Sequence, residues 1–139
     1  MTVYIDSNIF IYPVVNPTDD ARAIACKKIL LKIVNRELEA ATSFLTWDEF
    51  VYILRRHLGR EVSVSEGNKF LSFPYLSFLK VDEKVVSAAQ SLLSAYDLQP
   101  RDSIHIASAI LNNIHEVVSD DSDFDVVKDI KRIGLEKFR

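Results

Sequence analysis

The chain has 139 residues, a mass of 15.9 kDa and a formal net charge of −3, with 48% hydrophobic and 27% charged residues. This length suits one compact domain, so we expect residues 1–139 to form a single domain. The composition excludes a disordered or fibrous chain. The negative charge excludes a protein held on nucleic acid by general attraction to phosphate, so any such affinity must be local.

Short apolar runs alternate with longer helical patterns along the chain. In chain order we expect a strand at residues 2–5, a helix at 18–39, a strand at 40–44, helices at 46–58 and 63–73, a strand at 76–81, helices at 82–96 and 100–113, a strand at 116–119 and an edge strand near 130–138. This alternation predicts an α/β fold, a three-layer α/β/α sandwich around a mainly parallel central sheet.

Nothing in the sequence indicates export or membrane insertion. The apolar stretch 1–15 is interrupted by Asp6 and Asn8 and has no basic start, so we interpret it as neither a signal peptide nor a membrane span. The single cysteine, Cys26, cannot form an internal disulfide and has no metal-ligand spacing around it. We therefore expect a cytoplasmic protein with no membrane partner.

Two predicted strands run directly into carboxylates. Asp6 follows the first strand, and Asp121 follows residues 116–119 near the end of the chain. In open parallel sheets ligands bind outside the carboxyl ends of the strands, so both acids should lie along one edge. Each alone is explained as an ordinary turn residue. Together they favour a shared site, because like charges brought together need a cation, a proton or a basic partner.

A third acid, Asp102, lies in the first turn of the predicted helix 100–113, on one stripe with Ile106 and Ala109. The opposite side of this helix is also apolar, so the helix should be largely buried and Asp102 should face a cleft. The alternative is a first-turn acid favoured by the helix dipole, and both interpretations can hold together.

Glu49 and the histidines carry weaker signals. From the pattern of the helix 46–58, Glu49 is a solvated surface acid on the side opposite the apolar residues. His57, His105 and His115 lack the paired spacing of zinc sites, so we interpret them as packing or surface residues and assign no catalytic histidine.

Four segments in order resemble the motifs of PIN-domain nucleases, most closely the stand-alone VapC-type toxins of prokaryotic toxin–antitoxin pairs. They are Tyr4-Ile5-Asp6-Ser7-Asn8-Ile9, Ser43-Phe44-Leu45-Thr46-Trp47-Asp48-Glu49, Asp102-Ser103-Ile104-His105-Ile106-Ala107-Ser108-Ala109 and Ser119-Asp120-Asp121-Ser122-Asp123-Phe124. The resemblance covers almost the whole chain and promotes Glu49 to a site residue. Asp120 is an acid where the family pattern has a neutral residue, which leaves the fourth ligand open between Asp120, Asp121 and Asp123.

The resemblance implies an endoribonuclease that uses Mg²⁺ or Mn²⁺, which hard carboxylate oxygens suit. The residues it assigns are the catalytic acids Asp6, Glu49, Asp102 and Asp121, the metal ligands Asp6, Asp102, Asp121 and Asp123, and the residues that position the acids or a phosphate, Ser7, Asn8 and Ser119. It also implies an RNA substrate, a homodimer and a cognate antitoxin.

Cationic residues lie apart from these acids. One group is Lys27, Lys28, Lys32 and Arg36, and the other is Arg55, Arg56 and Arg60. We expect Arg56 and Arg60 to contact RNA phosphates, while a solvated helix face explains the first group equally well.

Three other functions remain open from the sequence. A non-catalytic PIN module that binds RNA or protein is opposed by the presence of all four acids. A phosphatase of the aspartyl-phosphate kind would have Asp-x-Asp after the first strand, where position 8 is Asn, and we find no acceptor Asp for a receiver domain. The aromatic run 70–78 suggests an interaction protein, but such runs are more typical of core and turn, though part of this one could serve dimerisation.

Overall fold

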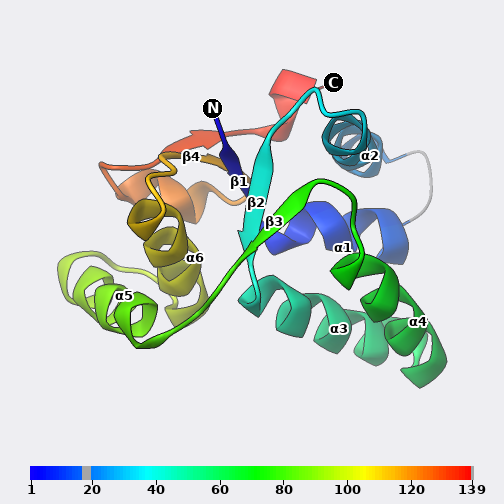
Figure 1. The fold of residues 1–139 in the computed structure, drawn as a ribbon, viewed down its shortest axis with the longest axis horizontal. Helices are drawn as coiled ribbons and strands as arrows, with labels where there is room; N and C mark the ends of the chain where they lie inside the picture. Colours follow the sequence, from blue (N-terminus) through cyan, green and yellow to red (C-terminus); the bar gives the residue numbers. More distant parts are fainter. Residues whose placement is uncertain (17–19, 139) are drawn as a thin grey trace.

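A five-stranded, entirely parallel sheet forms the centre of the molecule (Figure 1). The computed structural model describes residues 1–16 and 20–138. The strands are β1 (Val3–Ile5), β2 (Ala40–Ser43), β3 (Leu76–Leu79), β4 (Glu116–Val118) and β5 (Lys131–Ile133), and they are ordered β3-β2-β1-β4-β5. The predicted parallel sheet is therefore confirmed.

Helices cover both faces of the sheet, which confirms the predicted three-layer sandwich (Figure 1). One layer contains α1 (Ser7–Val15), α2 (Ala21–Val34), α3 (Leu45–Leu58) and α4 (Arg60–Leu71), and the other contains α5 (Glu83–Ala95) and α6 (Pro100–Leu111). Two short 3₁₀ helices, η1 (Ser122–Val126) and η2 (Leu135–Phe138), follow β4 and β5. No helix in these described parts is long and apolar enough to cross a membrane.

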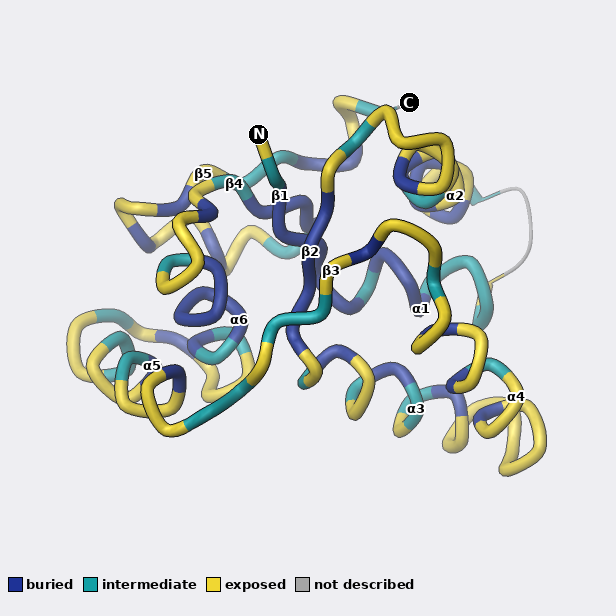
Figure 2. Tube along the Cα trace, viewed as in Figure 1, coloured by how far each residue is buried: buried dark blue, intermediate teal, exposed yellow. Residues whose placement is uncertain are grey.

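The central strand β1 contributes to both halves of the core. Val3 and Ile5 pack with the α1–α4 layer, while Tyr4 packs with α6 on the other face, as the two-residue period of a strand requires. Figure 2 shows β1 and β2 buried along their length, whereas the outer sides of α3, α4 and α5 are exposed. Burial on both faces explains the continuous apolar sequence of β1.

Helix α4 begins three residues before the predicted helix 63–73, and β3 ends two residues before the predicted end of the strand 76–81. Three larger differences from the sequence prediction remain. Helix α1 is not among the predicted elements, because its short apolar run contains Pro13, which normally breaks a helix. Helix α2 is shorter than the predicted 18–39: it follows Asp20, which accepts the N–H of Arg22, and residue 18 lies outside the described residues. The predicted C-terminal edge strand is limited to β5, after which the chain turns into η2.

Gly59 is the single residue between α3 and α4. Its φ of 91° and ψ of 174° lie in a region that side chains with a Cβ rarely adopt, and this conformation lets α4 fold back along α3. The close pairing of α3 with α4 fixes the helix that carries Glu49.

Replacing Gly59 with Ala should therefore destabilise the fold by about 1–3 kcal/mol through backbone strain, since nothing lies within 4 Å to clash with the new Cβ. Urea denaturation would measure this. The matched control is Ser65→Ala, an exposed change within α4 that should alter stability by no more than about 0.5 kcal/mol. Equal stabilities of the two variants would show that Gly59 is not strained.

Candidate functional site

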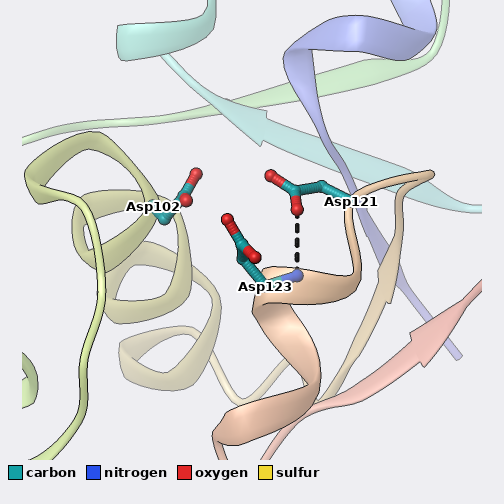
Figure 3. Close-up of side chains that lie close together, drawn as sticks. All are labelled: Asp102, Asp121 and Asp123. Atoms are coloured by element: carbon teal, nitrogen blue, oxygen red, sulfur yellow. Dashed lines mark hydrogen bonds between the residues drawn. The ribbon is translucent and has the colours of Figure 1, made fainter.

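Three carboxylates converge at the carboxyl edge of the sheet. Asp102 lies in the first turn of α6, while Asp121 and Asp123 lie at the start of η1, and one oxygen of each is within 4.8 Å of the others. Figure 3 shows the three side chains directed toward a common point. We call Asp102, Asp121 and Asp123 the acidic cluster.

A series of hydrogen bonds ties this cluster to the end of β1. Asp123 donates its backbone N–H to Asp121 Oδ1 at 2.9 Å, and Asp121 donates its own N–H to Ser119 Oγ at 3.0 Å. Ser119 then donates its hydroxyl to Asp6 Oδ2 at 2.6 Å, and Ser7 N–H donates to Asp6 Oδ1 at 2.8 Å. Ser119 and Ser7 are thus hydrogen-bonded to the Asp6 carboxylate, and their roles at a catalytic site stay a prediction.

Asp6, between the end of β1 and the start of α1, is only 5% exposed. Burial raises the pKa of Asp6, against the effects of His105 and of the hydrogen bond from Ser119. The charge of Asp6 is also one of the causes that raise the pKa of Asp102, so the two acids interact electrostatically. Asn8, in contrast, makes no side-chain hydrogen bond within residues 1–16 and 20–138, so its predicted positioning role stays a prediction.

The pKa of Asp102 is raised to about 6. Burial is the largest cause, followed by the charges of Asp121 and Asp6, while His105 lowers the pKa and Glu49 raises it. Repulsion among carboxylates of this kind is relieved when a cation binds between them.

The additional acid Asp120 points elsewhere. Its carboxylate pairs with Arg22 of α2, with 3.7 Å between Asp120 Oδ2 and Arg22 Nη1, and the guanidinium lies 5.2 Å from the centre of the Tyr12 ring. Asp120 is not part of the acidic cluster. This contact leaves Asp121 and Asp123 as the acids available from the fourth motif.

The helical pattern alone suggested that Glu49 is a solvated surface acid, and this prediction is wrong, because the side chain is partly buried. It lies near the start of α3 and its Oε1 is 2.5 Å from His105 Nε2 on α6. The apolar stripe predicted for α3 is correct at Phe50 and Leu54, but Trp47 is 40% exposed, so the buried side is rotated toward Glu49.

His105 is buried and contacts two polar side chains from distant parts of the chain. Its Nδ1 lies 2.6 Å from Tyr4 Oη, and its Nε2 contacts Glu49 Oε1. Burial opposes protonation, but Tyr4, Glu49 and Asp6 outweigh it and hold the pKa of His105 well above its usual range. The one available signal was spacing: His105 is three residues after Asp102, on the same side of a helix.

The two arginines predicted to contact RNA follow Glu49 in the chain, one near the end of α3 and one at the start of α4. Arg56 is exposed and seven residues beyond Glu49, which corresponds to about 10 Å of helix, and Arg60 begins α4. Arg56 therefore shares α3 with Glu49, whereas Arg60 lies beyond the end of that helix.

The sequence profile of the PIN domain matches residues 3–130. The chain belongs to the PIN domain family. None of the functionally curated proteins matches it. Several solved PIN-type structures share its fold at low sequence identity, and three of them are described next.

The DNA-bound VapBC of Salmonella typhimurium matches with 17% identity and a TM-score of 0.74, covering 97% of this chain and 99% of that chain. FitAcB of Neisseria gonorrhoeae matches with 15% identity and a TM-score of 0.73, covering 98% and 99%. The sarcin-ricin loop cleaving toxin VapC20 of Mycobacterium tuberculosis matches with 18% identity and a TM-score of 0.72, covering 89% and 93%. These likenesses show a PIN fold that spans nearly the whole chain.

The raised pKa of Asp102 predicts how stability depends on pH in metal-free protein. The folded state holds more protons than the unfolded state between pH 3.8 and about 6, so stability falls as pH rises through this window. Asp102→Asn should abolish this loss and gain about 1–2 kcal/mol over the wild type at pH 7, after allowance for partial solvent exposure. Urea denaturation in EDTA at pH 4 and pH 7 would measure it.

Asp82 provides the matched control, because it caps α5 by accepting the N–H of Val85 and its pKa is lowered by that hydrogen bond. Asp82→Asn should give no gain in stability across the same pH window. A loss of stability at pH 7 in Asp102→Asn would instead mark Asp102 as a simple helix-start residue.

Proposed function

We propose that this PIN protein is a metal-dependent endoribonuclease that hydrolyses RNA phosphodiester bonds and is the toxin of a toxin–antitoxin pair. The observation that carries the proposal is the convergence of Asp102, Asp121 and Asp123 within 4.8 Å, beside the buried Asp6. A non-catalytic PIN module that binds RNA or protein is the alternative.

The donor set fits Mg²⁺ or Mn²⁺. The acidic cluster offers carboxylate oxygens, which hard divalent ions prefer, and it contains no thiolate or imidazole. Cys26 is buried in α2, where burial raises its pKa to about 12, and it is not part of the acidic cluster. Asp102, Asp121 and Asp123 would hold the ion, with Asp6 as a direct or water-mediated ligand.

A divalent ion supplies Lewis-acid activation of the phosphate and of an attacking water. The chain's own residues then fix the geometry of the site. Ser119 and Ser7 lock Asp6 in one orientation, and Asp123 N–H locks Asp121. Glu49, held by His105, orients water or a second ion at the side of the site that faces α3.

The toxin assignment rests on similarity to VapBC structures, including those of Salmonella typhimurium and nontypeable Haemophilus influenzae. By analogy we propose a cognate antitoxin as a protein partner and a homodimer as the assembled form. Single-stranded or looped RNA is the proposed substrate class, because duplex RNA is presented to proteins mainly by its shape.

Purified protein should cleave structured RNA with Mg²⁺ or Mn²⁺ and lose this activity in EDTA. Asp121→Asn removes a member of the acidic cluster and should reduce the rate by at least about 100-fold. The neighbouring Asp120→Asn is the matched control and should retain activity within a few-fold, because Asp120 pairs with Arg22.

Thermal melting of the same samples separates the alternatives. Mn²⁺ at 100 times its Kd should stabilise the wild type by about 2.7 kcal/mol. Stabilisation without cleavage would favour the non-catalytic module, and undiminished cleavage in EDTA would disprove the metal mechanism.

RNA contacts by arginine are testable through salt dependence. Arg56 and Arg60 are the sequence-predicted contacts, and Arg22 joins them because it is half-exposed beside Asp120, one residue from the acidic cluster. Each substitution to Ala that removes a phosphate contact should reduce the slope of log K against log salt by about one unit. An unchanged slope in RNA-binding assays would remove that arginine from the RNA-facing surface.

A further inference from the structure

A buried polar chain connects the sheet to Glu49. Ser43 donates its backbone N–H to Tyr4 Oη at 3.1 Å, Tyr4 Oη lies 2.6 Å from His105 Nδ1, and His105 Nε2 lies 2.5 Å from Glu49 Oε1. Tyr4 and His105 are at most 1% exposed, so these hydrogen bonds are shielded from water. This series of hydrogen bonds joins β2, β1, α6 and α3, which come from distant parts of the sequence.

The protons of this chain can be assigned. A carboxylate only accepts hydrogen bonds, so His105 Nε2 must carry the proton that it shares with Glu49. At Nδ1, the Tyr4 hydroxyl donates to a neutral ring, or a doubly protonated ring donates to the Tyr4 oxygen. In both cases Nε2 is the donor to Glu49. Tyr4 thereby fixes the plane of the ring, and the ring fixes Glu49 Oε1.

We propose that His105, supported by Tyr4, is a positioning residue that holds the Glu49 carboxylate at the acidic site; this inference rests on the proposed nuclease function. His105 lies three residues after Asp102 on the same side of α6, so the Glu49 carboxylate that it contacts is held beside the helix that carries Asp102. Glu49 lies in an early turn of α3 with a partly exposed side chain. Without His105 it would be free to rotate into water.

A purely structural histidine is the competing explanation, since buried polar groups generally find partners. The two explanations differ in what happens to Glu49. A structural role predicts that activity follows stability when His105 is replaced, whereas a positioning role predicts that activity is lost through Glu49 alone.

Two replacements of His105 separate these roles. In His105→Gln the side-chain amide nitrogen can take the place of Nε2, so the variant keeps a donor for Glu49. In His105→Asn the shorter amide can take the place of Nδ1, so the variant keeps the Tyr4 contact and loses Glu49. We expect kcat for RNA cleavage to fall about 10–100-fold in His105→Asn with little change in KM, and His105→Gln to recover most of this loss.

A double-mutant cycle with Glu49→Gln tests the dependence directly. If His105 acts through Glu49, the double variant Glu49→Gln/His105→Asn should be no slower than Glu49→Gln alone. Multiplying losses in the double variant, or equal losses in His105→Asn and His105→Gln, would overturn the proposal. Melting temperatures of all variants identify any loss that is due to unfolding.

Proton NMR of metal-free protein provides a readout that needs no activity. The buried Nε2–H of His105 should give a slowly exchanging imidazole signal that moves or disappears in Glu49→Gln, a variant that keeps His105. A signal insensitive to Glu49→Gln would overturn the proposal. If the wild type cleaves no RNA, the proposed nuclease function fails, and the imidazole signal alone decides whether His105 holds Glu49.

Discussion

Repulsion between carboxylates is the constraint around which this molecule is built. Asp102 shows its effect most clearly, since burial and then the charges of neighbouring acids raise its pKa to about 6. The protein opposes the repulsion with donors directed at individual oxygens: Ser119 and Ser7 at Asp6, and Asp123 N–H at Asp121. Hydrogen bonds to charged groups contribute about 1.5–3 kcal/mol each, enough to hold such acids in place.

The topology of the sheet determines where these acids meet. The strand order β3-β2-β1-β4-β5 reverses direction between β1 and β4, and ligands bind at such a switch point in open parallel sheets. Asp6 N–H bonds to the carbonyl of Val118, so the two strand ends are joined directly at this point. After β3 the chain passes through α5 to α6, and the first turn of α6 adds Asp102 to the site from a third segment.

The sequence predicted those parts of the site that follow from local pattern. Apolar strands that end in acids identify Asp6 and Asp121, and helix periodicity identifies Asp102. Contacts between distant elements left no such trace. The pairing of Glu49 with His105 depends on how α3 and α6 approach each other. Helix periodicity assigned Glu49 to the surface, and the lack of zinc-type spacing assigned His105 to a packing or surface role. The sequence also left open whether Asp120 is the fourth acid of the site. In the structure Asp120 pairs instead with Arg22 on α2, a partner that no local pattern could identify.

The short edge strand β5 illustrates how the periphery of the fold serves its centre. Arg132, the middle residue of β5, binds both carboxylate oxygens of Asp125 at 2.8 and 3.2 Å and donates to the carbonyl of Ser119 at 3.2 Å. Those two partners lie at either end of the segment that carries Asp121 and Asp123. A planar guanidinium that engages both ends at once restricts the path of the segment between them. Three residues of strand therefore suffice at this edge, because their contribution is to orient the loop that completes the acidic cluster.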